Sequence, residues 1–145
     1  MHMVWTKNYE LGINAIDAQH KRIVDFINEL DDIANLPESN DRKENLQRVL
    51  GEVNKYIESH FGYEEVLLEK VGYPDSDRHK KVHALFGKRH KGYTKLIERE
   101  GNIAAEIGAA LEQWLMYHIR VEDAGWARYI RDMGGDWKRF FEATK

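Results

Sequence analysis

The sequence predicts an all-α protein that folds as an up-down-up-down four-helix bundle. Apolar side chains recur at alternating steps of three and four residues over four long segments, which is the period of an amphipathic helix. Alternation typical of strands is absent, and the only two prolines, Pro37 and Pro74, lie between periodic segments. Short connections between four such helices favour antiparallel neighbours.

The first predicted helix covers about residues 17–35, and its apolar stripe comprises Ile16, His20, Ile23, Ile27, Leu30 and Ala34. The second covers about 40–71, and its stripe comprises Leu46, Leu50, Val53, Ile57, His60, Glu64, Leu67 and Val71. Both stripes therefore contain a histidine, and the second also contains a glutamate one turn further on.

The third predicted helix covers about 75–99, between "GYPDSD" and "EGN", and its stripe comprises His79, His83, Phe86, His90, Tyr93 and Ile97. The fourth covers about 103–132, ends before two glycines at 134 and 135, and aligns Ile107, Leu111, Trp114 and His118. A tail over about 136–143 contains Trp137, Phe140 and Phe141. We expect the tail to form a short docked helix and to offer a contact for a protein partner.

The composition indicates one domain, residues 1–145, with a charged surface. Charged residues make up 32% of the chain and the net charge is −3, which argues against a nucleic-acid or anionic-membrane partner. The chain has no cysteine, so disulfides and thiolate metal sites are excluded. We find no signal-peptide h-region and no apolar run that could span a bilayer, and we expect a cytoplasmic protein.

The glutamate in the second stripe needs a partner. Glu64 lies on the apolar face, and an unpaired carboxylate in a packed core costs several kcal/mol. Each predicted helix places at least one histidine in its stripe, and the stripes of a bundle converge on its axis. Imidazole suits iron, copper, nickel and zinc, and carboxylates that bridge two cations favour a dinuclear site. A metal centre is therefore the predicted partner of Glu64.

Four stretches, "GINAIDAQHK", "HFGYEE", "GYPDSDRHKKVH" and "WLMYHIRVED", resemble the hemerythrin family in order and spacing, especially its single-domain bacterial members. The resemblance covers about Trp5 to Ile130 and implies a hemerythrin-like domain. It also implies two iron ions with an oxo or hydroxo bridge. The ligands that it implies are His79, His83 and His118 for one iron, His20 and His60 for the other, and Glu64 and Asp123 as bridges.

In this family dioxygen binds end-on at the five-coordinate iron, which the resemblance places at His20 and His60. Trp114 and Leu115 match residues that wall the oxygen pocket, although plain core packing is an equal interpretation of Trp114. Di-iron sites that oxidise substrates typically carry Glu-x-x-His pairs on two helices, and the stripes here contain none. We therefore expect a dioxygen-binding protein for transport, storage or sensing, and not an enzyme.

Two other classes of function stay open at this stage. One is a di-iron enzyme that acts on nitric oxide or peroxide, or that oxidises iron. The other is a sensory module whose tail contacts a protein partner.

Four residues outside the implied ligand set have other expected roles. His90 lies two turns beyond His83, about 10 Å along the axis, so we expect a core or boundary residue. Asp17 is expected to cap a helix, with orientation of the His20 ring as the alternative. Glu65 is expected to be solvated. Trp126 occupies a position where many family members carry tyrosine.

The fourth helix contains a conflict of register. Four residues after His118 comes Glu122, whereas the resemblance assigns the bridge to Asp123, which an ideal helix turns about 140° away from His118. The uninterrupted register leads to Val121, Gly125, Arg128 and Asp132, and a shift of one residue leads to Asp123, Trp126, Ile130 and Met133. We predict a π-bulge or local unwinding between His118 and Asp123, with Glu122 facing solvent.

Overall fold

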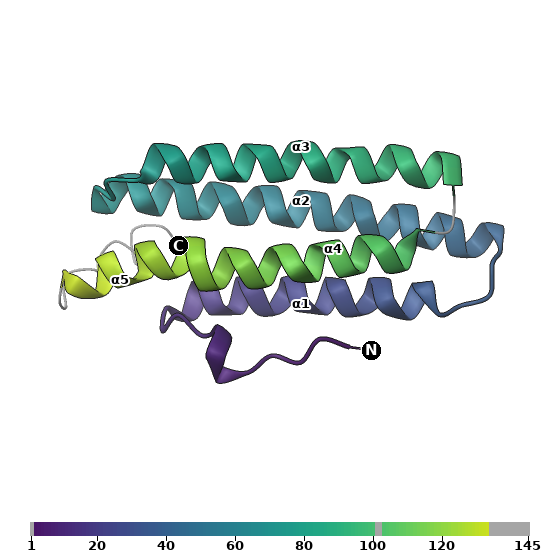
Figure 1. Ribbon diagram of the computed structural model, residues 1–145, viewed down its shortest axis with the longest axis horizontal. Helices are drawn as coiled ribbons and strands as arrows, with labels where there is room; N and C mark the ends of the chain where they lie inside the picture. The colour runs from purple at the N-terminus through teal and green to yellow at the C-terminus, as the bar shows by residue number, and fades with distance from the viewer. Residues whose placement is uncertain (1, 101–102, 134–145) are drawn as a thin grey trace.

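The structure is a computed structural model that describes residues 2–100 and 103–133. A 3-10 turn, η1 (Lys7–Tyr9), precedes four antiparallel helical rods (Figure 1). The rods are α1 (Asn14–Ala34), α2 (Asn40–Val71), α3 (Ser76–Glu100), and a fourth made of α4 (Ala104–Tyr117), the π-helical turn η2 (His118–Asp123) and α5 (Ala124–Asp132). The four antiparallel rods confirm the predicted up-down-up-down bundle. No strand occurs among the described residues. The tail predicted over 136–143 lies outside them.

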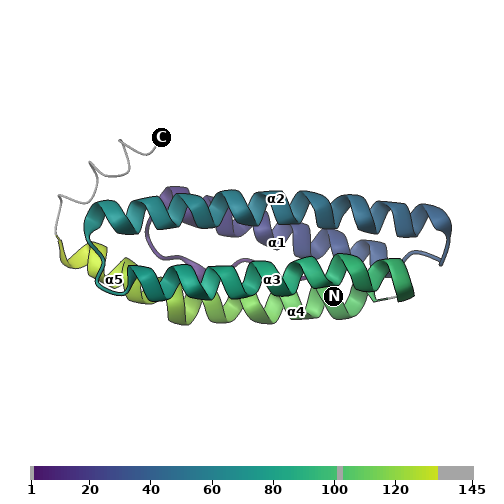
Figure 2. The same ribbon diagram turned by 90° about the horizontal axis from the view of Figure 1, so that it is seen from above.

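The rods pack as two layers. α1 packs against α2 and against α4, and α2 packs against α3. Figure 2 shows α1 and α2 in one layer and α3 and α4 in the other. Within the described ranges, no helix is both apolar enough and long enough to cross a membrane.

Local signals set the ends of α2. The Ser39 hydroxyl oxygen accepts a hydrogen bond from the Arg42 amide at 3.1 Å, which satisfies a free N–H of the first turn. Gly72 follows the helix at φ 70°, a left-handed conformation that favours glycine. The Arg42 side chain also donates to the Ile33 carbonyl at 3.1 Å, so the start of α2 satisfies the end of α1.

The role expected for Asp17 is wrong in both forms. α1 begins at Asn14 and not near residue 17, its N-cap is Ile13, and Asp17 lies inside the first turn. The Asp17 carboxylate accepts hydrogen bonds from the Leu11 amide at 2.8 Å and from the Gly12 amide at 3.2 Å. It therefore ties the incoming chain to α1, and it forms no hydrogen bond with the His20 ring.

The predicted stripes form the core. Every stripe residue of α2 is buried, and so is the α1 stripe from Ile16 to Leu30. In α3 the stripe is buried from His79 to His90, and the side chain of Ile97 lies outside the description. Polar stripe residues are as deeply buried as the apolar ones, since both His20 and Glu64 are 0% exposed.

The shift of register in the fourth rod is confirmed, because η2 is a π-helical turn that spans His118–Asp123. Asp123, Trp126 and Ile130 are each 0% exposed, whereas Val121 is 50% exposed. The extra residue of the π turn thus moves the apolar stripe by one position, as the sequence pattern requires.

The solvent-facing position predicted for Glu122 is wrong. Its side chain is buried and forms a two-pronged ion pair with Arg78, with N–O distances of 3.1 and 3.3 Å. Arg78 lies in the first turn of α3, so the pair fastens the π turn to the neighbouring rod. Glu122 therefore faces a cation on another helix and points away from the candidate metal ligands.

His90 is a core histidine, as predicted. It is 1% exposed, its ring packs between Phe86 and Tyr93, and neither ring nitrogen has a hydrogen-bond partner among the described residues. Burial disfavours the charged ring and lowers the pKa of His90 from 6.5 to about 4.

The lowered pKa of His90 should make the free energy of unfolding depend on pH. Between pH 6.5 and 4 the unfolded chain binds a proton at His90 that the folded chain does not, so stability is complete above pH 6.5 and falls as the pH drops. In urea unfolding of metal-free protein, wild type should lose about 2 kcal/mol more than His90→Gln between pH 7 and pH 5. Equal losses in the two proteins would show that His90 is not buried as a neutral ring.

Candidate metal centre

Buried polar side chains from all four rods converge in the interior of the bundle. The two-histidine group consists of His20 and His60, and the three-histidine group consists of His79, His83 and His118. Glu64 belongs to both groups, and Asp123 joins the first. Within each set of four side chains, one potential ligand atom from each lies within 4.8 Å of the others. All seven side chains are at most 3% exposed.

Glu64 presents one carboxylate oxygen to each group. Its Oε1 lies 2.8 Å from His60 Nε2 and 3.6 Å from His20 Nε2. Its Oε2 lies 3.1 to 3.6 Å from the Nε2 atoms of the three-histidine group, His79, His83 and His118. A carboxylate with this orientation can bind two cations at once.

Asp123 also presents one carboxylate oxygen to each group. Its Oδ2 lies 3.0 Å from His20 Nε2, and its Oδ1 lies 3.1 Å from His118 Nε2 and 3.4 Å from His79 Nε2. The π turn makes this possible, because it turns Asp123 inward next to His118. Each carboxylate thus spans both groups.

The site contains more acceptors and ring nitrogens than hydrogen bonds. Among the described residues, the buried atoms without a hydrogen-bond partner include Nε2 of His20, His60, His83 and His118, together with Glu64 Oε1 and Asp123 Oδ2. Orphaned polar atoms in a protein core are costly, and cations would satisfy all of these at once. The donor set fits two divalent transition-metal ions.

The charges of the metal-free site balance one another. Burial disfavours the charged form of His20 and of His118, but the nearby carboxylates of Asp123 and Glu64 outweigh it and raise the pKa of His20 to about 9 and that of His118 to about 10. For His60 burial prevails, and its pKa is lowered. Burial also opposes the charge of Glu64 and Asp123, yet the histidines hold the pKa of each carboxyl below its usual value. Because a metal needs neutral rings, metal binding must release protons here.

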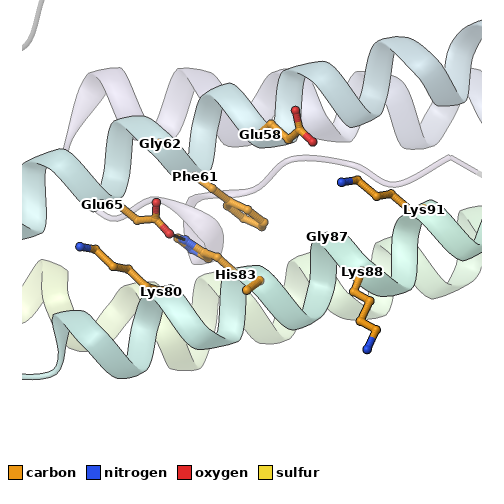
Figure 3. Close-up of a pocket in the computed structure, with 10 residues that line it drawn as sticks. Glu58, Phe61, Gly62, Glu65, Lys80, His83, Gly87, Lys88 and Lys91 are labelled. Atoms are coloured by element: carbon orange, nitrogen blue, oxygen red, sulfur yellow. Dashed lines mark hydrogen bonds and ion pairs between the residues drawn. The ribbon is translucent and has the colours of Figure 1, made fainter.

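The Nδ1 atoms of two candidate ligands, His60 and His83, contact residues for which the sequence pattern predicted no such role. Gln19 Oε1 lies 2.6 Å from His60 Nδ1. Glu65 Oε1 lies 3.3 Å from His83 Nδ1 (Figure 3), so the expectation of a purely solvated Glu65 is wrong, although its side chain remains 30% exposed. Such partners fix the tautomer and orientation of a ligating ring, and a carboxylate also raises its basicity.

A groove of about 420 Å³ lies between α2 and α3, next to the three-histidine group (Figure 3). His83 and Phe61 line it, and their rings stack with centroids 3.8 Å apart and planes 5° apart. The groove is wide at Gly62 and Gly87, where a Cβ would meet nothing within 4 Å. The groove therefore borders His83, whose side chain is 3% exposed, while Phe61 stacks on the face of the ring.

Trp114, one of the two residues expected to wall an oxygen pocket, contacts a ring of the candidate centre. The Trp114 ring stacks on His118, with centroids 4.8 Å apart, and on Phe86, with centroids 3.8 Å apart. Leu115 is 0% exposed. Trp114 therefore packs on His118 of the three-histidine group, which is the plain core-packing interpretation, and a wall at the two-histidine end stays a prediction.

The chain is similar to known proteins along most of its length. The model of the hemerythrin HHE cation binding domain matches residues 11–130. A bacteriohemerythrin of Pseudomonas aeruginosa is 39% identical over 90% of this chain and 82% of its own. A bacteriohemerythrin of Stenotrophomonas maltophilia is 34% identical over 89% and 82%, and a myohemerythrin of Theromyzon tessulatum is 29% identical over 82% and 86%. Together with the buried cluster of histidines and carboxylates, these matches show that the chain belongs to the hemerythrin family.

Proposed function

We propose that this chain is a non-haem di-iron protein that binds dioxygen reversibly, for transport, storage or sensing in the cytoplasm. The observation that supports the proposal best is the unequal division of the site. Two bridging carboxylates join three histidines on one side and two on the other, with family membership as independent support. Dioxygen is the proposed partner, and a protein partner of the tail stays a prediction.

The separate faces of the two carboxylates support two cations. Both Glu64 and Asp123 direct one oxygen to each histidine group, which a single ion between them would not use. We assign His79, His83 and His118 to one iron, His20 and His60 to the other, and Glu64 and Asp123 to both. The two ferrous ions bring four positive charges, and two carboxylates with a hydroxide lower the net charge to about +1.

The two-histidine group has one ring fewer than the three-histidine group, and we infer that dioxygen binds in the position that this leaves open. If two irons are bound, three ring nitrogens, two carboxylate oxygens and an oxo or hydroxo bridge would fill six positions at one of them, whereas two rings would leave one position open at the other. When bound, the iron pair would supply the electrons that reversible binding of dioxygen requires. We expect buried apolar side chains of the fourth rod, such as Leu115 and Ile119, each at most 1% exposed, to keep water from the site and so to limit the loss of a reduced oxygen species.

Reconstitution with ferrous iron in the absence of oxygen tests this proposal. We expect about two irons per chain and an optical spectrum that appears under oxygen and disappears under argon through repeated cycles. Elemental analysis that shows a single iron, or zinc after ferrous loading, would overturn it. Steady turnover of peroxide or nitric oxide, without stoichiometric oxygen binding, would instead support the di-iron enzyme.

A further inference from the structure

Trp126 forms a hydrogen bond with Asp123, one of the two candidate bridging carboxylates. The indole Nε1 donates a hydrogen bond to Asp123 Oδ1 at 2.9 Å. The ring is 0% exposed and belongs to the core of α5 together with Ala127 and Ile130. A donor so deeply embedded has little freedom to turn, so it fixes the carboxylate that it contacts.

This hydrogen bond makes the two oxygens of Asp123 unequal. Oδ1 accepts from Trp126 and faces His79 and His118. Oδ2 faces His20 at 3.0 Å and has no hydrogen-bond partner among the described residues. An oxygen that already accepts an N–H bond donates less charge to a cation, so Oδ2 is the stronger ligand of the two.

Glu64 has no comparable support. Among the described residues, the hydrogen bonds and ion pairs of Glu64 are all with the histidines of the site. Asp123 is therefore the carboxylate whose orientation depends on a residue outside the candidate ligand set. Its free oxygen points to the end that has only two histidines, where the loss of one donor matters most.

We propose that Trp126 is a positioning residue whose N–H orients Asp123 and directs its free oxygen to the two-histidine end, so that it controls how long the cation at that end stays bound. The proposal rests on the proposed function only through the presence of two cations. It requires no property of dioxygen.

The test compares Trp126→Phe with Trp5→Phe. Trp5 is a matched control, because its indole Nε1 is also buried but has no hydrogen-bond partner among the described residues. Iron release from the loaded proteins is followed by absorbance of an excess chelator. In Trp126→Phe we expect one of the two irons to leave about tenfold faster, with the other unchanged, whereas Trp5→Phe should match wild type.

Three further measurements distinguish the effect of the indole N–H on Asp123 from the effect of the ring's volume on packing. Trp126→Tyr, which restores a donor, should return release towards the wild-type rate. Replacement of Trp126 by benzothienylalanine, which keeps the shape of the ring and lacks the N–H, should reproduce the fast release, and it replaces the phenylalanine variant if that variant fails to fold. In the metal-free wild type, the Trp126 indole proton should exchange slowly with deuterium, unlike the indole proton in unfolded protein.

The proposal fails if the benzothienylalanine protein releases iron at the wild-type rate, or if both irons leave faster to the same extent. It also fails if the Trp126 indole proton exchanges freely in the folded metal-free protein. If wild type itself binds only one iron, the proposed function fails, whereas slow exchange of the indole proton that becomes fast in metal-free Asp123→Ala would still establish the hydrogen bond to Asp123.

Discussion

His60→Ala is expected to abolish dioxygen binding and to lower the iron content from two to about one per chain. His60 is one of only two rings in its group, and its removal leaves His20 with two carboxylate oxygens, which is too few donors to retain a cation firmly. His83→Ala should be milder, because His79 and His118 remain at that end. Iron content by elemental analysis and oxygenated optical spectra measure both effects.

His90→Gln is the matched control for these two variants. It removes a buried histidine from the same stripe as His83 but from neither ligand group, so iron content and oxygen spectra should stay close to those of wild type. The assignment of the oxygen site to the two-histidine end is wrong if His83→Ala loses oxygen binding while His60→Ala retains it.

The periodicity of the sequence predicted the four helices and the inward direction of the candidate ligands, because each helix shows its own apolar face in its own sequence. Short connections between the four helices then favoured the bundle. A residue in phase with Leu46 and Val53 must face the same way as they do, and so Glu64 faces the core. The π turn was predictable for the same reason. Asp123, Trp126 and Ile130 make a good apolar face only if one extra residue is inserted after His118.

Contacts between helices could not be predicted in this way. Glu122 is buried because Arg78, 44 residues away, meets it from α3, and nothing in the local pattern of the fourth helix reports that cation. Likewise, Gln19 supports His60 across the α1–α2 interface, although its own position in α1 is an ordinary polar one. Periodicity gives the direction of a side chain but not the residue that it meets.

Asp123→Asn should release most of the iron, whereas Glu122→Gln should retain it. The asparagine has the same shape as the aspartate and keeps an oxygen that can accept from Trp126, so the π turn should persist. The substitution removes one negative charge from a fully buried site that we propose holds two cations, and an amide is a poor bridging ligand. Elemental analysis after ferrous loading should therefore show a large loss of iron.

Glu122→Gln changes the neighbouring carboxylate on the other face of the π turn. It weakens the ion pair with Arg78, whose side chain is 61% exposed, so the expected cost in stability is below about 1 kcal/mol. That cost corresponds to a decrease of at most about 2–4 °C in the Tm of the metal-free protein. Iron content should stay at the wild-type value, because Glu122 faces α3 and contacts none of the candidate ligands.

The pair of variants distinguishes an uninterrupted α-helix from a π turn by chemistry alone. An uninterrupted helix would place Glu122, four residues after His118, on the ligand face and would turn Asp123 about 140° away from it. Loss of iron in Glu122→Gln with retention in Asp123→Asn would therefore reverse the assignment of the bridge and contradict the π turn. Loss of iron in Asp123→Asn with retention in Glu122→Gln would assign Asp123 to the metal. A lower Tm in Glu122→Gln that Arg78→Gln reproduces would assign Glu122 to the ion pair that joins η2 to α3.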